Sequence, residues 1–237
     1  MLYISAPFGN YINAGKKNVL SVIGTYTIDP RPGRLTQILK TLRYSFKAQA
    51  WYNSLGLRNP GIDSILKKYP LRSNRRANQI LSISAIEPND WRRFHEKIPQ
   101  SIQLELNISC PNIEKNYHTY IQDLPRFVER NPIVKLSPTM SDEEIKELYD
   151  MGFTKFHSCN TLKTIHGARS GDILKPHVIR QINLIKQLNL NNYCIAGGGI
   201  QNMKDIIEYK SIGANAFSLG TVCFNPFKLR KIIREYQ

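Results

Sequence analysis

The chain has 237 residues, of which 41% are hydrophobic, and this is enough to build one sizeable buried core. No apolar run approaches the roughly 20 residues of a membrane span, and no basic segment precedes an apolar block at the start, so we expect neither a transmembrane helix nor a secretory signal. The formal charge of +15 fits either a nucleic-acid partner or a basic surface that attracts anionic ligands, and charge alone does not separate the two.

The cysteines and histidines show no metal-ligand spacing. The four cysteines are far apart in the sequence, which is typical of reduced thiols inside the cell. We therefore expect a cytoplasmic protein without a metal site. The cysteines are Cys110, Cys159, Cys194 and Cys223.

Short strands alternate with helices along the whole chain. The predicted strands are 2–6, 19–26, 79–85, the start of 103–112, 132–136, 155–158, 193–196 and 216–219. The predicted helices are 62–68, 87–97, 117–129, 141–151, 176–188, 201–212 and 226–236. The helix over 141–151 begins with a capping-box pattern, Ser141 followed by Glu144. This alternation favours parallel βαβ units closed into a single (βα)8 TIM barrel over residues 1–237.

A long segment, 27–60, interrupts the alternation after the second strand. Pro30, Pro32 and Gly33 end regular structure there, and several aromatic residues follow. Segments of this length in a compact domain are usually binding loops, so we expect this one to cover the active site.

The stretch 103–112 changes character where its strand ends. Leu104 and Leu106 alternate as in a strand, and Asn107, Cys110 and Asn112 then place two carboxamides and a thiol together. Each residue alone fits an ordinary turn, and Cys110 alone fits a small buried hydrophobe. Together they offer donors, acceptors and a base to a small planar ligand.

Two further features point to a charged ligand. Glycines follow the last two predicted strands, at 197–199 and at Gly220, and their exposed amides are typical of a phosphate site in a barrel. Lys135 ends an apolar strand, where a cation needs a negative partner unless the strand end is at the surface. The sequence leaves both interpretations of Lys135 open.

In this order the motifs resemble the dihydroorotate dehydrogenase family, FMN-dependent barrel enzymes of pyrimidine synthesis. The resemblance covers about residues 23–227. It rests on the second-strand phrase 23–33, the substrate-loop phrase 53–57, the catalytic stretch 107–112, and the phrases 134–138, 159–161, 170–171, 197–199 and 220–221.

The resemblance implies a reaction and a set of roles. Cys110 would remove the C5 proton of dihydroorotate while the C6 hydride passes to flavin N5, and Lys135 would neutralise the charge on the reduced flavin. The implied substrate-binding residues are Asn53, Leu55, Gly56, Leu57, Asn107, Asn112, Asn160 and Thr161. The implied FMN-binding residues are Ala6, Thr25, Ser82, Asn107, Lys135, Gly171, Gly198, Gly199, Gly220 and Thr221. Soluble relatives also imply a homodimer without a membrane partner.

The chain departs from the family pattern at positions that concern the substrate. Relatives place a lysine near the end of the first or second strand, facing the orotate carboxylate, where this chain has Asn10 and Thr25-Tyr26. Three alternatives stay open. One is a tRNA dihydrouridine synthase, an FMN barrel with a similar Asn-x-x-Cys-Pro strand end, for which the basic charge would serve RNA. The second is a flavin-binding paralogue that has lost turnover. The third is a basic binding or scaffold protein that keeps the barrel without a flavin.

Overall fold

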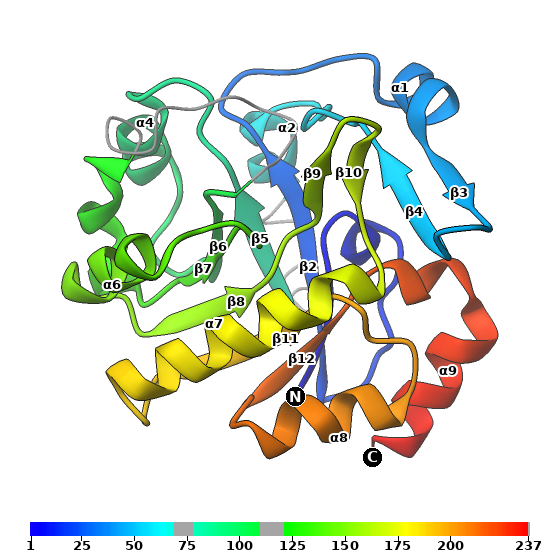
Figure 1. Ribbon diagram of the computed structural model, residues 1–237. Helices are drawn as coiled ribbons and strands as arrows, with labels where there is room; N and C mark the ends of the chain where they lie inside the picture. The colour runs from blue at the N-terminus through cyan, green and yellow to red at the C-terminus, as the bar shows by residue number, and fades with distance from the viewer. Residues whose placement is uncertain (69–77, 110–120, 237) are drawn as a thin grey trace.

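Eight parallel strands close into a barrel, as the alternating pattern predicts (Figure 1). The computed structural model describes residues 1–68, 78–109 and 121–236. Around the barrel the strands are β1 (Leu2–Ile4), β2 (Val19–Tyr26), β5 (Gln79–Ile83), β6 (Leu104–Asn107), β7 (Ile133–Lys135), β8 (Lys155–Ser158), β11 (Tyr193–Gly197) and β12 (Ala216–Leu219). The first strand pairs with the last, Leu2 opposite Phe217, and this pairing closes the barrel. The prediction of a (βα)8 fold is confirmed.

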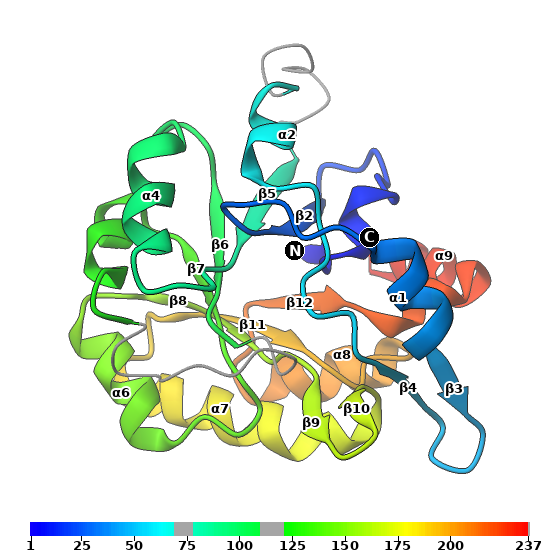
Figure 2. The same cartoon turned by 90° about the horizontal axis from the view of Figure 1, so that it is seen from above.

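Helices surround the barrel, as the view along it shows (Figure 2). The α-helices of this outer layer are α2 (Ile62–Leu66), α4 (Asp90–Lys97), α6 (Asp142–Asp150), α7 (Lys175–Leu188), α8 (Met203–Ser211) and α9 (Pro226–Glu235). Short 3-10 helices occur at η1 (Phe8–Asn10), η3 (Leu124–Arg130), η4 (Asp172–Leu174) and η5 (Thr221–Phe224). The helix predicted over 117–129 falls partly outside the described residues, and its described end is the 3-10 helix η3.

The start of α6 shows how the local sequence sets a helix boundary. The Ser141 hydroxyl accepts a hydrogen bond from the Glu144 amide at 3.2 Å, and the Glu144 carboxylate accepts one from the Ser141 amide at 2.8 Å. This is the predicted capping box, and it satisfies two amides that the first helical turn leaves without partners.

Alternation along the strands divides the core into two parts. In β6, Leu104 and Leu106 point outward and pack with the residues of the helix layer, while Glu105 and Asn107 point into the barrel. One end of the barrel interior is apolar and contains Tyr3, Val22, Ile80, Ile133, Ile195 and Ala216. The interior becomes polar toward the carboxyl ends of the strands, where the site lies.

The segment 27–60 contains regular structure of its own. It forms the helix α1 (Arg34–Thr41) and the strands β3 (Arg43–Ser45) and β4 (Ala50–Asn53). The last of these pairs with a second hairpin, β9 (Leu162–Thr164) and β10 (Gly167–Arg169), to make a small sheet in the order β3-β4-β10-β9. Figure 1 shows this sheet and α1 beside the carboxyl ends of the barrel strands.

Membrane crossing can be judged for the described part of the chain. No helix there combines the length and the apolar character that a bilayer span requires.

Candidate functional site

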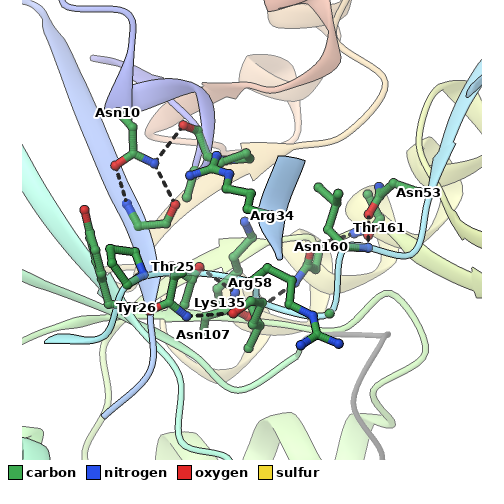
Figure 3. Close-up of a pocket in the computed structure, with 18 residues that line it drawn as sticks. Asn10, Thr25, Tyr26, Arg34, Asn53, Arg58, Asn107, Lys135, Asn160 and Thr161 are labelled. Atoms are coloured by element: carbon green, nitrogen blue, oxygen red, sulfur yellow. Dashed lines mark hydrogen bonds between the residues drawn. The ribbon is translucent and has the colours of Figure 1, made fainter. Parts of the chain in front are cut away.

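Two adjoining cavities open at the carboxyl ends of the barrel strands. The smaller has a volume of about 170 Å³ and is shown in Figure 3. The larger has a volume of about 410 Å³, within the range of roughly 300–1,000 Å³ that is usual for small-molecule sites. The cavities share part of their lining, namely Ala6, Pro7, Arg34, Asn53, Leu55, Lys135, Asn160 and Thr161. They are therefore two parts of one site.

Carboxamides dominate the polar lining of the smaller cavity. Asn53 comes from β4, Asn107 ends β6, and Asn160 follows β8. The Asn160 amide donates to the Asn107 side-chain oxygen at 3.2 Å and to the Ser109 hydroxyl at 3.1 Å. These contacts orient two carboxamides, and they leave one amide hydrogen on Asn107 and one lone pair on the Asn160 oxygen for a ligand.

A chain of hydrogen bonds runs from Asn107 down into the barrel. The Asn107 amide donates to the Thr25 hydroxyl at 3.0 Å, and the Thr25 hydroxyl lies 3.0 Å from that of Ser82. Ser82 in turn donates to Glu105 at 2.8 Å, and His157 Nδ1 lies 2.8 Å from the same carboxylate. Because an ionised carboxylate only accepts hydrogen bonds, the chain has one direction, with the Asn107 oxygen facing away from Thr25.

The protonation states of the two buried groups follow from their surroundings. Burial alone raises the pKa of Glu105, but the positive charge of Lys135 and the hydrogen bonds from His157 and Ser82 outweigh it and lower the pKa to about 2. Burial lowers the pKa of His157 below its ordinary value, although Glu105 opposes the shift. The imidazole is therefore neutral at neutral pH, and its Nδ1 proton lies toward Glu105.

Lys135 is a buried cation that faces both cavities. Lys135 is only 6% exposed, yet its ammonium group has no hydrogen-bond or ion-pair partner among the described residues. Glu105 stabilises it from within the barrel through Coulomb attraction. The arrangement leaves the ammonium hydrogens available to an anionic or electron-rich ligand, so the surface-lysine interpretation is wrong.

The substrate-loop phrase is held in place by one buried asparagine. Asn59 is 6% exposed and donates to the Leu57 carbonyl at 2.6 Å and to the Thr27 hydroxyl at 2.8 Å. Its side-chain oxygen accepts from the Gly61 amide at 2.8 Å. Leu57 has a positive φ of 55° and Gly56 one of 60°, so the loop is tightly curved where it lines the smaller cavity.

Glycines and aromatic rings form the larger cavity. Gly198 and Gly199 have φ values of 121° and 74°, in the region that favours glycine. A Cβ on Gly220 would meet no atom within 4 Å, so this backbone borders open space. Trp51 stacks on Phe224 with ring centroids 4.2 Å apart and forms part of the apolar wall.

Burial keeps the described cysteine thiols protonated. It raises the pKa of Cys159 to about 12, that of Cys194 to about 11 and that of Cys223 to about 12. Cys159 lines the larger cavity. None of these three thiols has an environment that would make it a base at neutral pH. Cys110 and Asn112, the predicted base and one predicted ring contact, lie outside the described residues.

The structure brings most of the predicted residues together. Those that line the smaller cavity are Ala6, Thr25, Asn53, Leu55, Gly56, Leu57, Asn107, Lys135, Asn160 and Thr161. Those that line the larger cavity are Ala6, Asn53, Leu55, Lys135, Gly171, Gly198, Gly199, Gly220, Thr221, Asn160 and Thr161. Ser82 lines neither cavity, because it is fully buried one layer below Thr25.

Sequence reasoning missed several residues of the site. Glu105 reads as a solvent-facing residue in an alternating strand, and only barrel closure places it inside. His157 belongs to no local motif. The only indication in the sequence is a histidine within a strand that is otherwise expected to be buried. Arg34 and Asn59 were part of the long segment, for which no helix was predicted.

The chain is similar in sequence to known proteins along most of its length. A sequence model described as dihydroorotate dehydrogenase matches residues 8–237. The dihydroorotate dehydrogenase B (NAD(+)) catalytic subunit of Desulforamulus reducens is 28% identical over 260 residues, which cover 96% of this chain and 83% of that protein. The same subunit of Malacoplasma penetrans is 30% identical over 229 residues, covering 83% of this chain and 74% of that protein.

The fold also matches solved structures. The crystal structure of DHODH from Eimeria tenella in complex with ferulenol has a TM-score of 0.78 at 19% identity, covering 99% of this chain and 80% of that chain. At this identity the likeness concerns the fold. The sequence matches decide between the two flavin-barrel families that the strand-end motif fits. Because they span nearly the whole chain, the protein belongs to the dihydroorotate dehydrogenase family.

Proposed function

We propose that the protein oxidises dihydroorotate, or a close pyrimidine relative, with FMN as its cofactor. One observation carries the proposal. A carboxamide-lined cavity and a glycine-lined cavity adjoin, and the buried cation Lys135 faces both. Such a pair suits a planar pyrimidine lying against a planar cofactor that ends in a phosphate.

The residues of the larger cavity fit FMN. Apolar walls that include Trp51 and Leu174 suit an isoalloxazine ring, and the backbone of Gly199 and Gly220 can approach a phosphate closely. Lys135 would hold the pyrimidine end of the ring with the ammonium hydrogens that no described residue binds. When bound, FMN supplies the two-electron acceptor for the hydride that leaves C6 of the substrate.

The smaller cavity fits the substrate ring. Asn53, Asn107 and Asn160 present donors and acceptors to the alternating N–H and C=O edge of a pyrimidine, and Thr161 lies beside them. Their mutual hydrogen bonds fix two of these carboxamides before a ligand arrives. The family resemblance adds Asn112 to this set of substrate-binding residues. Asn112 lies outside the described residues.

Removal of the C5 proton requires a base, and we assign this role to Cys110. This residue follows Ser109, whose hydroxyl and carbonyl accept hydrogen bonds from Asn160 at the mouth of the site. The other cysteine near the site, Cys159, is a poor base because burial raises its pKa to about 12. The thiolate of Cys110 would take the C5 proton as the C6 hydride leaves. The substrate would thus lose one proton and one hydride, which together amount to two protons and two electrons.

The proposal extends to the setting of the enzyme. The family resemblance supports a homodimer that works in the cytoplasm. It leaves the electron acceptor among fumarate, NAD and a quinone, and the relatives named above are NAD(+)-type catalytic subunits. Light scattering on the purified protein tests the dimer, and steady-state assays with each acceptor identify the oxidant.

A pair of cysteine variants tests the assignment. Cys110→Ala should abolish dihydroorotate oxidation, lowering kcat by at least about 100-fold, while the protein still binds FMN. Cys194→Ala, the matched control at a buried cysteine that lines neither cavity, should keep most of the wild-type activity. Turnover that survives in Cys110→Ala would remove the proposed base. A yellow wild-type protein that does not oxidise dihydroorotate would instead support the paralogue without turnover, and one that does not bind FMN would contradict the cofactor.

A further inference from the structure

The lining of the site is cationic. Arg34, Arg58 and Lys135 line the smaller cavity, and no Asp or Glu is among the described residues that line either cavity. A lining that carries cations and no acidic residue favours an anionic ligand. Lys135 also lines the cavity assigned to the cofactor, so a second anionic group, on the substrate, has to be matched by another residue.

The residues at the ends of the first two strands do not supply that match. Both polar groups of the Asn10 side chain are engaged with backbone, because its amide donates to the Gly24 carbonyl at 2.9 Å and its oxygen accepts from the Gly24 amide at 3.1 Å. Gly24 itself leaves no room for a side chain, since a Cβ there would lie 2.5 Å from the Ser82 carbonyl oxygen. Anion recognition must come from another element.

Arg34 has the position and the free hydrogen-bonding capacity for this role. It is the first residue of α1 and lines both cavities. Its guanidinium carbon lies 5.4 Å from the centre of the Tyr11 ring, and the group has no hydrogen-bond or ion-pair partner among the described residues. In Figure 3, Arg34 occupies the middle of the view, with Asn10 to one side and Asn53 and Asn160 to the other.

The helix that carries Arg34 is fixed to the substrate loop. Gln37 donates to the Ser54 carbonyl at 2.7 Å, and the Thr41 hydroxyl accepts from the Ser54 amide at 3.0 Å. Arg34 is therefore held in a defined position relative to Asn53 and Leu55. Arg58 is less suited, because it is exposed, lines only the smaller cavity and donates to the Pro32 carbonyl at 3.3 Å.

We propose that Arg34 binds the carboxylate of the substrate and so makes the site selective for an anionic pyrimidine over a neutral one. The inference rests on the proposed function. A guanidinium offers two parallel N–H donors to a carboxylate, which gives both affinity and orientation. Arg34 acts in binding, and the proton and hydride transfers do not pass through it.

The experiment compares two ligands that differ by the carboxylate. Binding of orotate and of uracil to the FMN-loaded protein is measured by isothermal titration calorimetry for the wild type, Arg34→Gln and Arg34→Lys. Arg34→Gln should weaken orotate about 10- to 100-fold and leave uracil within about 2-fold, because only a charge-assisted hydrogen bond is lost. Arg34→Lys should give an intermediate orotate affinity, since it keeps the charge and loses the paired geometry.

A control and a kinetic readout complete the test. Lys40→Gln removes the same charge from an exposed position of the same helix and should leave orotate affinity unchanged. In Arg34→Gln the KM for dihydroorotate should rise about 10- to 100-fold, with a much smaller change in kcat.

The outcomes separate the two proposals. If Arg34→Gln binds orotate as tightly as the wild type, or loses uracil affinity to the same extent, the role of Arg34 is overturned while the proposed function stands. If the FMN-loaded wild type neither oxidises dihydroorotate nor binds orotate, the proposed function fails and the role of Arg34 fails with it.

Discussion

At the scale of single residues, the charge balance inside the barrel depends on Glu105. Glu105 is buried and ionised. Its carboxylate stabilises Lys135 and orients His157. Its hydrogen-bond chain also sets the direction of the Asn107 carboxamide at the mouth of the site. Stability and ligand orientation are therefore linked through one side chain that does not itself line a cavity.

Removing this charge should destabilise the fold strongly. Glu105→Gln leaves Lys135 as a buried cation without a counter-charge, and we expect a loss of about 3 to 5 kcal/mol in the free energy of unfolding. Urea denaturation of both proteins measures the difference. Glu96→Gln is the matched control, because Glu96 pairs with Arg92 at a site where its side chain is 62% exposed, and the loss there should stay below about 1 kcal/mol.

The pH dependence of stability follows from the carboxyl group of Glu105. Its pKa is lowered in the folded protein from 4.5 to about 2, so between these values the unfolded chain binds more protons than the folded one. The contribution of Glu105 to the free energy of unfolding is therefore fully present above pH 4.5. It decreases as the pH falls toward 2, by about 3 kcal/mol in total. Urea unfolding across this range should show a steeper decline in the wild type than in Glu105→Gln, and parallel declines would contradict the assignment.

Residue-scale prediction from the sequence succeeded where a side chain stood next to a strand end. Asn107 and Lys135 were recognised because polar residues are unusual at those places. Glu105 was not, because alternation alone does not show whether the second face of a strand meets water or the inside of a barrel. Arg34 was not, because it lies in the long segment 27–60, where no helix was predicted and an arginine usually lies on the surface.

At the scale of elements, α1 acts as a support for the substrate loop. The predicted consequence concerns Gln37, whose amide donates to the Ser54 carbonyl. Gln37→Ala should raise the KM for dihydroorotate about 3- to 10-fold, because the loop loses one fixed contact while its chemistry is unchanged. Steady-state kinetics measure this, and Thr36→Ala, at an exposed position of the same helix, should have no effect. An equal effect of the two variants would mean that the contact does not position the loop.

The turn after β12 makes a prediction about the cofactor. A Cβ on Gly220 meets no atom within 4 Å and would occupy the cavity itself. Gly220→Ala should therefore weaken FMN binding by about 10-fold or more through overpacking, while the melting temperature of the cofactor-free protein changes by less than about 4 °C. Fluorescence titration with FMN gives the affinity. Normal FMN affinity in this variant would place the phosphate elsewhere.

Elements were predictable from the sequence in proportion to their burial. The eight barrel strands were found because apolar residues mark them, and β2 matches its predicted range. The strands β3, β4, β9 and β10 were missed, since they are only three or four residues long, and their two hairpins are joined by the pairing of β4 with β10, which lie far apart in the chain. Tertiary pairing of this kind leaves no local pattern to read.

At the scale of the whole molecule, barrel closure produces the site. It turns one face of each strand inward and brings the ends of β2, β6 and β7, with the segment after β8, to one mouth. Residues from positions 5 to 224 then line a single pair of cavities. The order of motifs along the chain predicted this convergence, because the carboxyl ends of parallel barrel strands all lie on the same face.

In the proposed reaction, dihydroorotate bound at this mouth of the barrel loses hydrogen with the help of Cys110. The most direct measurement is anaerobic mixing of the FMN-loaded protein with dihydroorotate, without any added electron acceptor, while the visible absorbance of the flavin is followed. We expect rapid loss of that absorbance and formation of one orotate per flavin in the wild type, and neither change in Cys110→Ala. A flavin that stays oxidised in the wild-type protein would contradict the proposed reaction.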